Sequence, residues 1–221
     1  MNRMIRILSA LALLVPLAAC GAQQSAETEE TEEPAVTEEA VIEETAESEE
    51  TKEEGKALIA YFSRADENYN VGVIEEGNTY KVAKEIAAQT GCDLFEIRTV
   101  NGYPQSYDEC IAIAQKEQDE NARPELAETI DLSEYDEIYL GSPVWWGDYP
   151  MAVYTFLESN DFAGKTIHPF NTHEGSGSAG FEAKLKRVCP DAEVTEILSI
   201  QGAEAQNDPD RVKQAVADWL K

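Results

Sequence analysis

Three polar, glycine-rich segments hold most of the residues that could do chemistry: residues 63–79, GSPVWWGDYP at 141–150 and NTHEGSGSAG at 171–180. The first contains Ser63, Asn78 and Thr79, with Thr79 near the start of an expected helix. Hydroxyl groups, amide side chains and free N–H groups at a helix N-terminus suit a phosphate. The same residue types also serve as ordinary helix caps, so this segment alone leaves both roles open.

The second segment places two tryptophans side by side. Gly141, Pro143 and Gly147 around Trp145 and Trp146 predict a loop rather than a strand or a helix. An aromatic wall with backbone donors beside it suits a flat aromatic ligand. The alternative is that both rings only fill space under the loop.

The third segment could bring Thr172, His173, Glu174 and further N–H groups toward the same ligand. Ser142 or Ser176 could also be drawn with His173 and Glu174 as a hydrolase triad. The G-x-S-x-G turn of such enzymes is missing, and adjacent His and Glu side chains are poorly placed to pair. The spacing of the two histidines, His168 and His173, does not predict a metal site.

The elements that position these segments alternate along the chain. Short apolar runs predict strands at 56–62, 92–100, 137–140, 166–170 and 192–200. Helical spacing and capping residues predict helices at 79–91, 105–121, 151–159, 181–189 and 209–221. This order predicts an α/β fold, a parallel sheet with helices on both faces. The three segments follow the carboxyl ends of the first, third and fourth strands, so they should meet at one edge.

The motifs YFSR, GNTYKVAKEIA, GSPVWWGDYP and THEGSGSAG resemble those of the flavodoxin family, over nearly all of residues 56–221. The resemblance implies a three-layer sandwich with a five-stranded parallel sheet in the order 2-1-3-4-5, and bound FMN. It implies that the phosphate is held by Ser63, Asn78 and Thr79, with Arg64 as a further cofactor contact. It implies that the isoalloxazine is lined by Pro143, Val144, Trp145, Trp146 and Gly147, and that its other side is closed by Thr172, His173, Glu174, Gly175, Ser176 and Gly177.

Two features of the first two segments qualify this resemblance. Residues 65–76 are an insertion into a first loop that is usually compact, and they could form a lid over the flavin or a partner surface. The insertion weakens the case for Arg64, which also stands at a variable position of the motif. One tryptophan would lie against the flavin while the other packs behind it, and we favour Trp146 for the contact.

The N-terminal part of the chain predicts export. Residues 1–20 combine Arg3 and Arg6 with an apolar run and end in LAAC, which resembles a lipoprotein signal with Cys20 as the lipidated residue. An ordinary signal peptide is the alternative. Residues 21–55 are an acidic segment, expected to be a disordered tether, with 14 Glu and one Lys between positions 25 and 55.

Residues 56–221 hold 14 Lys and Arg against 30 Asp and Glu, a net charge near −16. Such a surface argues against binding nucleic acid. The resemblance to flavodoxins, together with the export signal, implies an electron-transfer flavoprotein at the outer face of the membrane, working with a redox partner protein or a small acceptor. The alternative is an FMN-dependent reductase for NAD(P)H and quinones or nitro compounds. Neither requires a catalytic side chain. A disulfide among Cys92, Cys110 and Cys189 is left open.

Overall fold

The computed structural model describes residues 55–221. The predicted signal segment, Cys20 and the acidic tether up to residue 54 lie outside the described residues. Within residues 55–221, no helix has the length and hydropathy that crossing a bilayer would require. The three cysteines in this part of the chain, Cys92, Cys110 and Cys189, are free thiols.

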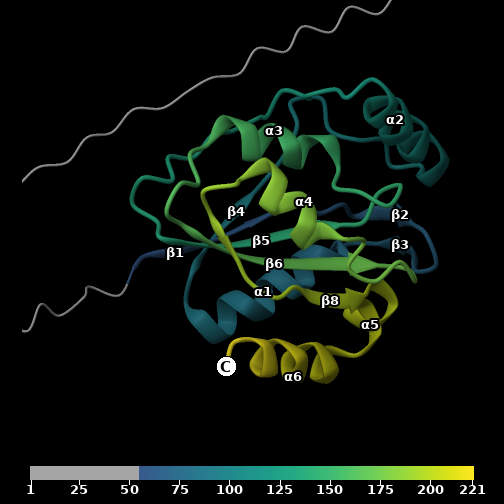
Figure 1. Ribbon diagram of the computed structural model, residues 1–221. Coiled ribbons are helices and arrows are strands. Elements are labelled where there is room, and N and C mark those ends of the chain that lie inside the picture. Colours follow the sequence, from purple (N-terminus) through teal and green to yellow (C-terminus); the bar gives the residue numbers. More distant parts are fainter. Residues whose placement is uncertain (1–54) are drawn as a thin grey trace, which may run out of the picture. The chain divides into compact units, whose positions relative to one another are not determined.

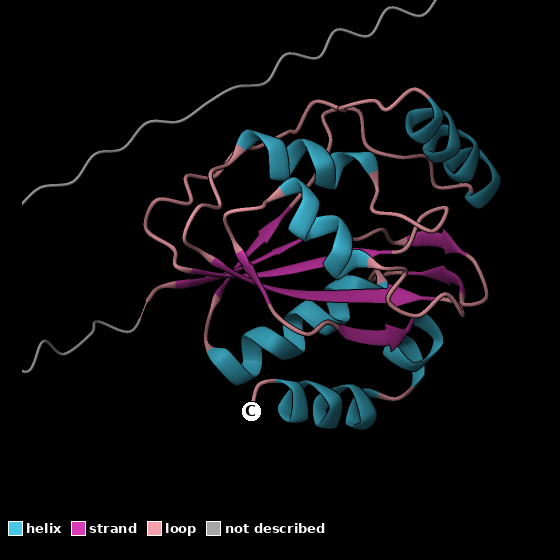
Figure 2. Cartoon of the chain, in the orientation of Figure 1, coloured by secondary structure: helices cyan, strands magenta, loops and turns pink. Residues whose placement is uncertain are grey.

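A parallel sheet forms the middle layer (Figures 1 and 2). Its strands are β1 (Ala57–Tyr61), β4 (Asp93–Glu96), β5 (Glu137–Pro143), β6 (Thr166–His173), β7 (Glu193–Val194) and β8 (Leu198–Gln201). They run in the order β4-β1-β5-β6-β7, with β8 also paired to β6. The predicted order 2-1-3-4-5 is therefore confirmed, with a last strand that is split into two pieces on β6.

Helices cover both faces of the sheet, as Figure 1 shows. One face carries α1 (Asn78–Thr90), α5 (Gly202–Asn207) and α6 (Pro209–Trp219), and the other carries α3 (Met151–Ser159) and α4 (Phe181–Val188). The strand β1 is buried on both sides because its side chains alternate between the two layers. Leu58 and Ala60 pack in the α3/α4 core, whereas Ile59 and Tyr61 pack in the α1/α6 core.

The remaining elements lie beside the carboxyl ends of the strands. The insertion forms a small hairpin of β2 (Asp66–Asn68) and β3 (Gly72–Ile74), and α2 (Tyr107–Asp119) lies next to it. The sequence patterns did not predict the hairpin or α5. They also ended β5 and β6 three residues early, so Pro143, Thr172 and His173 lie at strand ends rather than in loops.

His168 gives the fold a predictable response to acid. Its ring stacks on Tyr139 at 4.8 Å, and its Nε2 lies 3.4 Å from Glu137 Oε2. Burial lowers the pKa of His168 more than the neighbouring carboxylates Glu137 and Glu193 raise it. Folding therefore favours the neutral ring, and this contribution to stability is lost as the pH falls through the unfolded-state value of about 6.5.

We expect the protein to lose stability between pH 7 and pH 5, and His168→Gln to flatten that decline. The histidine's share should be at most about 1 kcal/mol, because solvent screens part of the ring. Urea unfolding at several pH values measures it. Equal slopes in wild type and His168→Gln would contradict the assignment.

Candidate functional site

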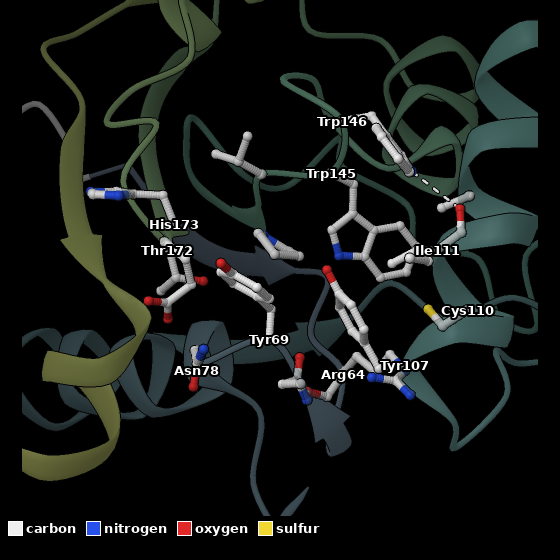
Figure 3. A pocket seen from close by; sticks show the side chains of 15 residues that line it. Arg64, Tyr69, Asn78, Tyr107, Cys110, Ile111, Trp145, Trp146, Thr172 and His173 are labelled. Atoms are coloured by element: carbon white, nitrogen blue, oxygen red, sulfur yellow. Dashed lines mark hydrogen bonds between the residues drawn. The ribbon is translucent and has the colours of Figure 1, made fainter. Parts of the chain in front are cut away.

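The three segments meet at a pocket of about 240 Å³ at the carboxyl ends of β1, β5 and β6 (Figure 3). Nine of the predicted site residues line it: Arg64, Asn78, Pro143, Val144, Trp145, Trp146, Thr172, His173 and Glu174. Six others lie in the same segments but outside the lining: Ser63, Thr79, Gly147, Gly175, Ser176 and Gly177. The insertion and α2 supply the other lining residues, which are not among the predicted site residues: Asn68, Tyr69, Tyr107, Cys110, Ile111 and Ala114.

The two halves of the first segment come together despite the insertion. Ser63 Oγ accepts a hydrogen bond of 3.0 Å from the Tyr80 N–H in the first turn of α1. Gly77, immediately before α1, allows this approach, because a Cβ there would lie 2.2 Å from Ser63 Oγ. Buried Thr79 shares a hydrogen bond of 2.8 Å with Thr172 at the end of β6. The start of α1 is thereby fixed to both β1 and β6.

Arg64 points its guanidinium at backbone carbonyls. It donates to Pro104 O at 2.6 Å, to Gln105 O at 2.6 Å and to the carbonyl of Glu67. These bonds join the base of the β2–β3 hairpin to the loop before α2. Arg64 lines the pocket, but its N–H groups are engaged in holding these two segments together.

The two tryptophans have different environments. Trp145 is partly buried and makes edge contacts with Phe62 at 5.2 Å and Tyr103 at 4.9 Å between ring centroids. Trp146 is 53% exposed, and its Nε1 donates to Ile111 O on α2 at 3.1 Å. Figure 3 shows Trp146 beside Ile111 at the α2 side of the pocket.

A tight turn holds this pair of rings. Trp145 and Asp148 exchange two backbone hydrogen bonds of 2.8 and 2.9 Å, and Gly147 between them has a φ of 74°. Lys184, on α4, donates from Nζ to Gly147 O at 2.6 Å and lies 3.1 Å from Asp148 Oδ1. The turn is therefore tied to the helix layer behind it.

Glu174 connects the third segment to the insertion. Its Oε2 accepts a hydrogen bond of 2.9 Å from Asn70 Nδ2 at the tip of the hairpin. Its Oε1 is buried without a hydrogen-bond partner. A buried carboxylate oxygen without a donor is costly, so this atom marks a place for a ligand's O–H or N–H group.

The hydrogen bonds in the third segment do not form a hydrolase triad. His173 Nδ1 accepts from the Gly175 N–H at 3.0 Å, and Ser142 Oγ donates to the carbonyl of Pro143 at 2.8 Å.

Burial raises the pKa of the Cys110 thiol, which keeps it protonated and unreactive at neutral pH. Residues 55–221 also contain no cluster of His, Cys, Asp and Glu that could hold a metal ion.

Two residues of α5 reach the site and could not be identified from the sequence. Gln206 Nε2 donates to Asn78 Oδ1 at 2.7 Å and to Glu76 O at 2.8 Å. Gly202 lies against Asn78 and Glu174. No sequence signal pointed to them, because the segment between the last strand and α6 has no apolar periodicity.

Comparison with known proteins places this geometry in a family. The flavodoxin family's sequence profile matches residues 56–219. A structure from Bacteroides uniformis ATCC 8492, of a protein assigned as a flavoprotein, is similar at 29% identity and a TM-score of 0.57, covering 74% of this chain and 98% of that one. No curated protein sequence matches the chain significantly.

Two further structures support the fold alone. A protein assigned as a flavoprotein from Bacteroides eggerthii DSM 20697 shares 24% identity with a TM-score of 0.59, covering 75% of this chain and 98% of that one. A flavoprotein in complex with FMN from Lactobacillus acidophilus NCFM shares 22% identity with a TM-score of 0.53, covering 76% and 99% of the two chains.

Proposed function

This chain belongs to the flavodoxin family, and we propose that it binds FMN in the pocket at the carboxyl edge of its sheet and transfers electrons. The convergence of the three segments on one pocket is the observation that carries this proposal. Membership in the flavodoxin family supports the choice of cofactor, and the Lactobacillus protein of the same fold is in complex with FMN.

The residues present fit FMN. The first N–H groups of α1 have no acceptor within the helix, and Ser63, Asn78 and Thr79 surround that helix end, which suits a phosphate dianion. Because Gly77 has no side chain, Ser63 can lie close to the start of α1, where both can contact one phosphate. The unpaired Oε1 of Glu174 offers an acceptor for a hydroxyl group of the ribityl chain.

The aromatic side chains would hold the isoalloxazine ring. Trp146 presents a half-exposed ring to the pocket and lies against the flavin, while Trp145 packs behind it on Phe62 and Tyr103. Bound FMN supplies the redox chemistry, and the protein orients the ring and sets its potential. The acidic charge of the domain disfavours a further negative charge on the ring and so lowers that potential.

The first test is reconstitution with FMN. We expect the purified protein to retain the absorption bands of oxidised flavin after desalting. Titration with dithionite under nitrogen should then show two separate one-electron steps, the behaviour of an electron carrier. Protein that retains no flavin would contradict the proposal.

An FMN-dependent reductase of quinones or nitro compounds is the second candidate. The ring pair Tyr69–Tyr107, with centroids 6.0 Å apart, favours it because these side chains give the pocket a second aromatic wall for a planar acceptor. A single two-electron step in the dithionite titration, with oxidation of NADH in the presence of a quinone, would select this function over the carrier.

We further propose that the protein works as a lipoprotein at the outer face of the membrane, anchored through Cys20. The LAAC motif and the acidic segment after it support this location. Metabolic labelling with a radioactive fatty acid tests it, because Cys20→Ser should abolish the label and release the protein from the membrane fraction.

A further inference from the structure

Gln206 decides which way the Asn78 side chain faces. A backbone carbonyl only accepts hydrogen bonds, so the end of Gln206 that lies 2.8 Å from Glu76 O must be its NH₂ group. That NH₂ group only donates, so the Asn78 atom 2.7 Å away must be Oδ1. The orientation of Asn78 is thus set by a chain of contacts that begins at the backbone.

The Nδ2 of Asn78 is thereby left on the pocket side. Figure 3 shows the amide nitrogen turned toward Thr172 and the oxygen turned away from it. A Cβ at position 202 would lie 2.2 Å from Asn78 Nδ2 and 2.3 Å from Glu174 Oε1, so α5 closes this wall of the pocket and a side chain there would displace the ends of Asn78 and Glu174. Within residues 55–221, no protein group accepts a hydrogen bond from Asn78 Nδ2.

We propose that Gln206 is a positioning residue for the cofactor phosphate, holding Asn78 so that its Nδ2 donates to a phosphate oxygen. This inference rests on the proposed function, because the phosphate is that of FMN. Without Gln206 the Asn78 amide is free to turn, and the neighbouring carboxylate of Glu174 competes for its N–H groups. The α5 segment therefore helps the protein to distinguish FMN from riboflavin, which has the same ring and lacks the phosphate.

Gln206→Met tests the proposal, because methionine keeps the length of the side chain and removes its donor. We expect the dissociation constant for FMN to rise about tenfold and that for riboflavin to change less than twofold, measured by quenching of flavin fluorescence. Gln214→Met is the matched control, since Gln214 on α6 donates only to the exposed Asp218 of its own helix, at 3.0 Å. It should leave both constants unchanged.

Two further variants test the same arrangement, and the first does so even if Gln206→Met folds poorly. Gly202→Ala inserts a methyl group against Asn78 Nδ2 and should also lower the affinity for FMN more than the affinity for riboflavin. In the double variant Asn78→Ala/Gln206→Met, the affinity for FMN should be less than twofold below that of Asn78→Ala alone, because the two residues act through one hydrogen bond.

The possible outcomes separate this inference from the proposed function. If wild type binds FMN and Gln206→Met binds it equally well, or loses FMN and riboflavin affinity in parallel, the positioning role is wrong while the proposed function stands. If wild type binds neither flavin, the proposed function fails and the positioning role fails with it. Selective loss of FMN affinity in Gln206→Met and Gly202→Ala supports the role of α5.

Discussion

Replacing Trp145 with alanine should lower the free energy of unfolding of the apoprotein by about 3 kcal/mol, the low end of the range for buried aromatic side chains. The ring is only partly buried, but it fills the space between Phe62 and Tyr103 with edge contacts at 5.2 and 4.9 Å. Its loss leaves a cavity under the turn that carries Trp146. Urea unfolding followed by circular dichroism measures the change, and Trp145→Phe should recover more than half of it.

Trp146→Ala is the matched comparison, because it removes the same side chain from the next position. With 53% of the ring exposed and one hydrogen bond to Ile111 O, we expect a loss of stability below about 1 kcal/mol. Under the proposed function the same change should lower the affinities for FMN and for riboflavin alike by roughly tenfold, since both flavins carry the isoalloxazine ring. Equal stability losses for the two variants would contradict this assignment of one ring to the core and the other to the pocket.

These two tryptophans also show what the sequence could predict. Glycines and prolines around them correctly indicated a turn after a buried strand, because those residues restrict the backbone locally. Neighbouring positions in the sequence do not reveal which ring meets the core. That depends on Phe62 and Tyr103, which come from other parts of the chain and reach Trp145 only in the folded sheet.

The sheet itself was predictable for the same local reason. Apolar runs and capping residues marked strands and helices in alternation, and the rule for parallel sheets then brought the three segments to one edge. The hairpin and α5 were not predictable, because their segments are too short to carry a periodic signal. Their form depends on tertiary bonds such as Asn70 to Glu174 and Gln206 to Asn78.

Gly77→Ala should have the largest effect on binding. The φ of Gly77 is −64°, a value that alanine adopts without strain, so the effect of the substitution comes from steric clash of the added Cβ. A Cβ there would lie 2.2 Å from Ser63 Oγ and 2.6 Å from Arg64 O, and a backbone atom cannot move aside as a flexible side chain can. We expect the free energy of unfolding to fall by about 2 kcal/mol through this overpacking.

The affinity for FMN should fall much further than stability alone explains. Separating Ser63 from the first turn of α1 breaks its bond to the Tyr80 N–H and moves the groups that would donate to the phosphate apart. The affinity for FMN should then fall by roughly 30- to 100-fold. Fluorescence titration measures this. Gly164→Ala is the control: Gly164 has a φ of 74° with nothing within 4 Å of its Cβ position, far from the lining residues.

Gly164→Ala should therefore cost about 1 kcal/mol of backbone strain and leave FMN binding unchanged. Comparing FMN binding by Gly77→Ala and by Gly164→Ala separates a general loss of stability from damage to the phosphate site at the start of α1. If Gly77→Ala bound FMN as tightly as Gly164→Ala, the start of α1 would not hold the phosphate. The convergence of Ser63, Asn78 and Thr79 would then be explained as helix capping, the role that the sequence alone left open.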